Sequence, residues 1–159
     1  MGLDMFLIKR KKNVIDDEWN EVCYWRKANQ IHKWFVDHVQ NGFDDCGEYK
    51  VTEDQIDELR ELCKELVKKI ELRDGQVYIG SRYDNRDGEF VEIKEYKDGK
   101  VIANPEVCEE MLPTQEGFFF GHTEYDEWYY EELKDTIDQL EKALAVDFNE
   151  YDLIYTSSW

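Results

Sequence analysis

The sequence predicts an α+β fold in which three helices pack on a mostly antiparallel sheet, with a β-meander insertion around residues 74–104. Three observations favour this class. Apolar residues recur every three or four positions in three separate segments, as in amphipathic helices. Between the second and third of these segments the apolar period changes to two, as in half-buried strands. Both ends of the chain have strand composition, and we expect residues 1–159 to form a single domain.

The first elements are a strand and a long helix. Residues 3–10 are apolar on both alternating faces, which indicates a strand within a sheet. Residues 19–42 predict the first helix, with a cap at Asp16 or Asp17 and an end at Gly42. Its apolar stripe consists of residues at helical spacing, namely Tyr24, Ala28, Ile31, Phe35 and Val39.

The second helix is predicted from residues 52–70. Thr52 and Gln55 form a capping-box pattern at its start. One apolar face follows, formed by Ile56, Leu59, Cys63, Leu66, Val67 and Ile70. The opposite face consists of Glu and Lys and is typical of a solvated surface.

The segment after Asp74 predicts strands. QVYIGSRY and EFVEIKEY have strand composition, and Asp98-Gly99 before KVIA indicates a tight hairpin turn. A short helical turn is expected around 107–111. Residues 117–121, GFFFG, predict either a short buried strand or a loop held by its aromatic side chains.

The third helix is expected to begin after a cap at Thr123. Its core stripe consists of Tyr130, Leu133, Ile137, Leu140 and Leu144. The chain ends in DLIYTSSW, a short strand whose expected partner is the N-terminal strand.

The formal net charge of −18 limits the partners of the chain. The segment from Glu106 to Asp152 has 15 acidic residues and two lysines, so most of the charge lies there. Such a balance argues against direct binding to nucleic acid or anionic lipid. No stretch of about 18 apolar residues is present, so no membrane span is expected. The four cysteines lack paired spacing, which predicts reduced thiols in the cytoplasm.

Several blocks of the sequence resemble a family of short phage- and prophage-encoded proteins. These blocks are MGLDMFL, YWRKANQIHKWFV, DDCGEY, LPTQEGFFFG, TEYDEWYYEELKDTIDQLEK and the final SSW. The resemblance covers most of residues 1–71 and 112–159, and is weaker through 74–104. It implies a genomic setting in which small proteins act against host defence, by binding an effector or its nucleotide signal in the cytoplasm of the host cell.

A first group of candidate ligand-binding residues lies on the predicted first helix: Trp25, Arg26, Asn29, His32 and Lys33. Arginine offers a planar fork of donors for phosphate or carboxylate, asparagine binds an amide or base edge, and tryptophan stacks on a ring. The alternative is that the tryptophan belongs to the core and the cations pair with the abundant acids, an interaction that is usually weak.

A second group surrounds the start of the third helix: Thr114, Gln115, His122, Tyr125 and Trp128. A polar loop that leads into a helix N-terminus binds anions through free backbone amides. The alternative is a helix capped by its own acids, with the aromatic residues packed beside it.

Signatures of catalysis and of metal or cofactor binding are missing from the sequence. His122 and Glu124 match the H-x-E half of the zinc deaminase signature, but no P-C-x-x-C follows. There is no H-E-x-x-H, phosphate-binding loop or dinucleotide fingerprint. Cys46 could form a thiol–imidazole pair with His32 or His38, the only residues assignable to an enzyme. We therefore expect a non-enzymatic protein without metal or cofactor.

The third helix also presents acids at one-turn intervals, at Glu127, Glu131, Asp135 or Asp138, and Glu141. Such rows imitate a nucleic-acid backbone, although they also simply maintain solubility. The sequence thus supports two hypotheses. The first is a phage counter-defence protein that sequesters a small anionic, nucleotide-like ligand. The alternative is an acidic nucleic-acid mimic that blocks a basic host protein. Trp159 and exposed sheet edges allow association into a homo-oligomer.

Overall fold

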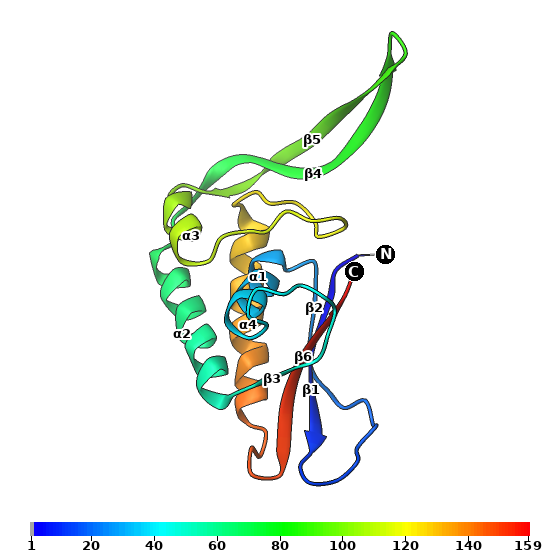
Figure 1. Ribbon diagram of the computed structural model, residues 1–159. Helices are drawn as coiled ribbons and strands as arrows, with labels where there is room; N and C mark the ends of the chain where they lie inside the picture. The colour runs from blue at the N-terminus through cyan, green and yellow to red at the C-terminus, as the bar shows by residue number, and fades with distance from the viewer. Residues whose placement is uncertain (1) are drawn as a thin grey trace.

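The computed structural model describes residues 2–159; Met1, where the predicted domain begins, lies outside the described part. The described chain forms four helices and two antiparallel sheets (Figure 1). The larger sheet has the order β2-β1-β6-β3, formed by β1 (Asp4–Lys11), β2 (Glu21–Arg26), β3 (Tyr49–Val51) and β6 (Tyr151–Ser158). The helices are α1 (Asn29–His38), α2 (Glu53–Lys69), α3 (Pro105–Met111) and α4 (Glu127–Leu144). The smaller sheet is a hairpin, here called the arm, of β4 (Leu72–Arg86) and β5 (Glu89–Ile102).

The α+β class is confirmed, and the two terminal strands pair as expected. β1 and β6 run antiparallel from the pair Asp4 and Ser158 to the pair Lys11 and Tyr151. The helices cover one side of this sheet (Figure 1). The buried side chains of α2 and α4 pack together and against the sheet, forming the core. The structure has four helices rather than three, because the turn expected around 107–111 is a short helix of its own.

The first predicted helix is wrong over its N-terminal half. Residues 21–26 form β2, and the helix begins only at Asn29. Cys23 and Trp25 are buried, while Tyr24 is 40% exposed, an alternation that fits a strand. Main-chain pairing with β1 therefore overrides the helical spacing that Tyr24 shares with the core residues further along. Lys27, with φ of 56°, then turns the chain from strand into helix.

The predicted β-meander is instead a single long hairpin. Its turn is Asp87-Gly88, where both residues have positive φ, of 54° and 86°. This is the conformation that favours Asp-Gly in a two-residue hairpin loop. The predicted turn, Asp98-Gly99, lies within β5 opposite Gln76 and Gly75. Both Asp-Gly pairs have the same local preference, and the register of the strands selects the first. The arm extends away from the body of the molecule (Figure 1).

The sequence predicts the N-terminal cap of α2 correctly but not that of α4. The Thr52 capping box of α2 is confirmed, with both reciprocal hydrogen bonds formed. The cap of α4 is Asp126 rather than Thr123, because the Asp126 carboxylate accepts hydrogen bonds from the main chain of Trp128 and Tyr129. Residues 117–121 form a loop rather than a strand, but of its aromatic side chains only Phe120 is buried, whereas Phe118 and Phe119 are exposed.

Candidate functional site

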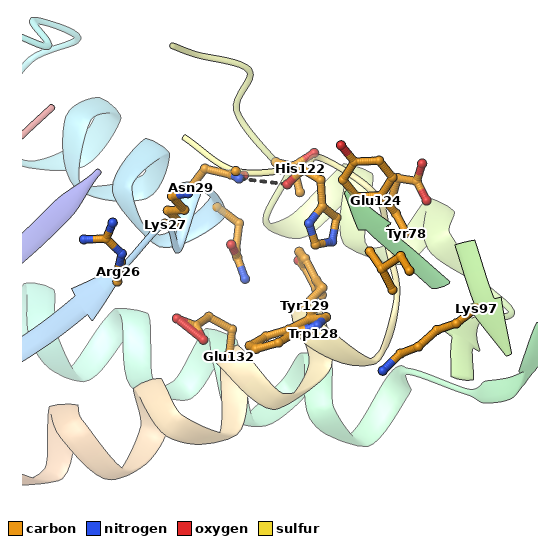
Figure 2. Close-up of a pocket in the computed structure, with 14 residues that line it drawn as sticks. Arg26, Lys27, Asn29, Tyr78, Lys97, His122, Glu124, Trp128, Tyr129 and Glu132 are labelled. Carbon is orange, nitrogen blue, oxygen red and sulfur yellow. Dashed lines mark hydrogen bonds between the residues drawn. The ribbon is translucent and has the colours of Figure 1, made fainter. Parts of the chain in front are cut away.

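A cavity of about 590 Å³, here called the pocket, lies where four parts of the chain meet (Figure 2). These are the turn between β2 and α1, the segment 112–126, the first turns of α4, and the base of the arm. The lining residues are Arg26, Lys27, Asn29, Gln30, Tyr78, Ile79, Lys97, Thr114, Gly121, His122, Glu124, Trp128, Tyr129 and Glu132. The volume is in the range of small-molecule binding sites in proteins.

Asn29 fastens one wall of the pocket. Its side-chain amide donates to the carbonyl oxygens of Phe120 and His122, each at 3.0 Å. Its side-chain oxygen accepts from the main-chain N–H of Gln115, also at 3.0 Å. Because Asn29 is buried and all three groups are engaged, it joins α1 to the segment 112–126. Asn29 therefore positions the wall and is not available to bind a base edge.

Two tight turns bring the β2–α1 connection against the same segment. Lys27 and Gly121 both have positive φ, of 56° and 86°. A Cβ atom on Gly121 would lie 3.2 Å from the Cβ atom of Lys27, so the two turns pack closely. The main-chain N–H of Lys27 also donates to the carbonyl of Leu3 at 2.7 Å. These contacts fix where the Lys27 side chain leaves the main chain.

The base of the arm forms the opposite wall. The main-chain N–H of Ile102 donates to the carbonyl of Tyr125 at 3.1 Å, and the Tyr96 hydroxyl donates to Glu124 at 3.0 Å. The rings of Tyr78 and His122 pack with centroids 5.3 Å apart. The arm is thus tied to the segment 112–126, and its side chains enter the pocket at fixed positions.

Positive charge reaches the pocket from three elements. Lys27 and Lys97 form no ion pair among residues 2–159. The Arg26 guanidinium donates to Asp4 at 3.0 Å and remains half exposed. His122 makes a 3.0 Å contact through Nε2 with the buried Asp126 carboxylate. In a chain of net charge −18, the cations Arg26, Lys27 and Lys97 make the pocket a place where an anion can bind.

Aromatic surface lies beside these cations. Trp128 on the first turn of α4 is 62% exposed and lines the pocket, as does Tyr78 from the arm. Tyr129 is buried, and its hydroxyl donates to the Leu112 carbonyl at 2.6 Å. Trp128 therefore offers an open indole face for stacking, whereas Tyr129 supports the floor.

Glu132, one turn further along α4, is partly buried at the edge of the same pocket. Burial, with a smaller contribution from the nearby Asp135 charge, raises the pKa of the Glu132 carboxyl to about 7. Within residues 2–159 its carboxylate has no hydrogen-bond or ion-pair partner. A carboxyl with such a raised pKa in a pocket is a common feature of functional sites.

The pocket includes five of the ten predicted ligand-binding residues: Arg26, Asn29, Thr114, His122 and Trp128. Among the other five, Trp25 is in the core, with its indole N–H donating to Thr136 at 3.0 Å. Lys33 forms an ion pair with Asp37 at 2.9 Å. This agrees with the alternative given above, in which the cations of the first group pair with acidic residues. Gln115 contributes its main-chain N–H to the Asn29 clamp, and Tyr125 accepts from the main chain of Thr114 at 3.2 Å.

His32, the fifth of these, is fully buried and belongs to the core. Its two ring nitrogens contact the Tyr155 hydroxyl at 2.6 Å and Asp44 at 3.0 Å. Burial lowers the pKa of His32, partly offset by the Asp44 charge. A neutral ring that donates to Asp44 and accepts from Tyr155 satisfies both contacts. Both nitrogens are thus engaged by residues other than Cys46.

Sequence reasoning missed the pocket residues on the arm and on the second turn of α4, namely Tyr78, Ile79, Lys97 and Glu132, as well as Lys27. Strand composition alone does not place the arm beside the other candidate residues. The spacing of Trp128 and Glu132, four residues apart on a predicted helix, was the one available signal, because such residues share a helix face.

Residues 2–159 contain neither a candidate membrane-spanning helix nor a candidate metal-binding cluster. No helix among them is long and apolar enough to cross a membrane. No group of three or more His, Cys, Asp or Glu side chains in this part of the chain is arranged to hold a metal ion.

Comparison of the sequence with protein-family models found no match, and comparisons with curated proteins and with solved structures found none either.

Proposed function

We propose that this chain is a phage-encoded, non-enzymatic counter-defence protein that sequesters a small anionic, nucleotide-like ligand in the pocket. The observation that carries this proposal is the combination of Arg26, Lys27 and Lys97 with the open indole of Trp128 around one cavity. The phage setting rests on the sequence resemblance described above.

The pocket residues divide between the two parts of such a ligand. Lys97 supplies a point charge for phosphate and Lys27 adds a second cation to the pocket, and neither has to leave an existing ion pair among the described residues. Trp128 supplies a stacking face for a base, an interaction worth about 1–3 kcal/mol per base in other proteins. Binding requires no chemistry from these groups, which supports capture rather than turnover.

The proposal is tested by thermal-shift measurements with nucleoside mono-, di- and triphosphates and cyclic nucleotides. A ligand at 100 times its dissociation constant stabilises the folded state by about 2.7 kcal/mol, which is a shift of several degrees in Tm. We expect at least one member of the panel to produce such a shift. A panel without any shift would contradict the proposal.

Lys97 and Lys94 provide a matched pair of variants on β5. Both are exposed lysines of the arm without an ion pair among the described residues, but only Lys97 lines the pocket. Lys97→Glu is expected to weaken nucleotide binding about ten-fold or more, because it places a negative charge beside the phosphate. Lys94→Glu should leave the affinity within about two-fold, and equal losses in both variants would indicate nonspecific charge attraction.

A second candidate function is an acidic nucleic-acid mimic that blocks a basic host protein. It is favoured by the row of exposed acids on α4, namely Glu131, Asp135, Asp138 and Glu141. Charge reversal separates the two functions. The double variant Glu131→Lys and Asp138→Lys should abolish mimicry but leave nucleotide binding unchanged, because neither residue lines the pocket.

A further inference from the structure

Trp128 and Glu132 occupy consecutive turns on one face of α4. Residues four apart on a helix are neighbours, with Cβ atoms about 5–6 Å apart. Both line the pocket, and in Figure 2 they lie side by side beneath it. A planar ring stacked on the Trp128 indole would therefore present one of its edges to the Glu132 carboxylate.

The Glu132 carboxylate is ready to accept hydrogen bonds. It is partly buried, and no described residue donates to it. Its oxygens are not among the fully buried side-chain atoms without a partner in the described chain, so water can hydrogen-bond to them until a ligand takes its place. Besides burial, the charge that acts on the Glu132 pKa is Asp135 on its own helix, while the other charged residues lining the pocket are Arg26, Lys27, Lys97 and Glu124. The Arg26 guanidinium is already bonded to Asp4, so the free acceptor positions of Glu132 point to a ligand that brings N–H donors.

We propose that the pocket selects guanine nucleotides, with the base stacked on Trp128 and its N1–H and 2-amino groups donating to the two oxygens of Glu132. This inference rests on the proposed function and names the ligand class of the same pocket. A carboxylate offers two acceptors and no donor, and guanine is the nucleobase whose pairing edge has two adjacent N–H donors.

The other bases fit this carboxylate less well. Adenine and cytosine each place a ring-nitrogen acceptor beside their amino group, and that lone pair would face a carboxylate oxygen. Uracil has one N–H donor between two carbonyl acceptors. Each of these bases therefore leaves one Glu132 oxygen unpaired or repelled, and a well-made bidentate contact discriminates between bases by about 1–3 kcal/mol.

The negative charge of Glu132 also sets the direction of the ligand. The phosphate of the ligand is repelled by the Glu132 carboxylate and attracted to Lys97, which lies on the other side of the Trp128 indole (Figure 2). Figure 2 shows Trp128 between Glu132 and Lys97, which enters from the arm. A guanine nucleotide can thus place its base edge at Glu132 while its phosphate extends toward Lys97.

The test on the native protein is calorimetric titration with GMP, IMP, AMP, CMP and UMP at pH 8. IMP has the N1–H of guanine but lacks its 2-amino group. We expect GMP to bind about ten-fold or more tightly than AMP, CMP or UMP, with IMP in between. Equal affinities for all five would overturn the guanine assignment and leave the proposed function standing. If no nucleotide of the wider panel binds, the proposed function itself fails.

Glu132→Gln tests the acceptor directly, with Glu131→Gln as the matched control outside the pocket. The amide has one donor and one acceptor, so the variant is expected to lose the preference for GMP over AMP while still binding AMP. Native selectivity should rise between pH 6 and pH 8 as the carboxyl ionises, and selectivity of the variant should not change. A variant that keeps the GMP preference would overturn the assignment, and its melting curve establishes that it folds.

Discussion

The ionised Glu132 side chain opposes the stability of the fold, although it is the acceptor in the ligand site proposed above. Its carboxyl has a pKa of about 7, raised from the ordinary value of 4.5 chiefly by burial. The folded protein therefore holds a proton that the unfolded chain releases at lower pH. At neutral pH its charged form lacks a donor among the described residues, so the fold bears a desolvated carboxylate. A ligand that donates to this carboxylate would remove the cost.

The pH dependence of stability tests this description of Glu132. Below about pH 4.5 the carboxyl is protonated in both states; as pH rises to about 7, the unfolded chain ionises first and the free energy of unfolding falls. Glu132→Gln removes this titration, so its stability relative to the native protein should rise between pH 4.5 and pH 8 by on the order of 2 kcal/mol.

Urea unfolding across this pH range provides the measurement, with Glu131→Gln as the control. The exposed Glu131 side chain should give a difference that is nearly constant with pH. A Glu132→Gln difference that is equally flat would mean that the carboxyl is not desolvated in solution.

At the level of elements, the start of α4 determines the shape of the pocket. Asp126 is buried and accepts from two main-chain N–H groups of the helix, while its second oxygen contacts His122. It also takes part in an isolated β-bridge with Val101 at the base of the arm. The helix, the segment 112–126 and the arm thus meet at one residue, which holds Trp128 in position.

Asp126 and Thr123 can be compared directly, because the sequence favoured Thr123 as the cap. Asp126→Ala should lower the free energy of unfolding by about 1–2 kcal/mol or more, since two helix N–H groups and His122 lose their acceptor. Thr123→Ala should change it by less than about 0.5 kcal/mol, because no hydrogen bond of its hydroxyl is found in the described chain. Chemical denaturation of both variants decides the matter, and a larger loss at Thr123 would contradict the assigned cap.

At the level of the whole molecule, negative charge is concentrated outside the arm. Residues 72–102 contain seven acidic and six basic residues, so almost all of the net charge of −18 belongs to the body. The ion pairs along α2 and α4 are largely exposed and join residues three or four apart, such as Lys69 with Glu65. Such pairs contribute little, and self-repulsion of the body is the larger electrostatic effect on stability.

Salt is therefore expected to stabilise the protein. Raising the NaCl concentration from about 10 mM to about 200 mM shortens the Debye length from about 30 Å to under 10 Å and screens repulsion among the acids. The free energy of unfolding from urea titrations should rise, while nucleotide affinity measured in the same buffers should fall because ligand attraction is screened as well. A free energy of unfolding that decreases with salt would show that the ion pairs dominate.

Elements whose local signals agree with one another could be predicted from the amino-acid sequence. Residues 52–70 combine a capping box with one apolar face, and residues 3–10 and 152–159 have strand composition, so α2, β1 and β6 could be predicted. The residues of β2 fit both a helical apolar spacing and the alternation of a strand, so local signals do not decide between them. Pairing with β1 and the hydrogen bonds from Gln139 to the Tyr24 main chain select the strand.

Which chemical groups share a pocket depends on how distant segments of the chain pack together. Lys97 and Trp128 are distant in sequence and meet because the arm docks on the segment 112–126. Asn29 and His32 have the composition of ligand-binding residues, but burial and hydrogen bonds assign the first to a clamp and the second to the core. The pKa of Glu132 depends in the same way on burial, which local spacing does not encode. Residue types and helical faces follow from the sequence, whereas desolvation and the choice of partners arise only when distant segments pack together.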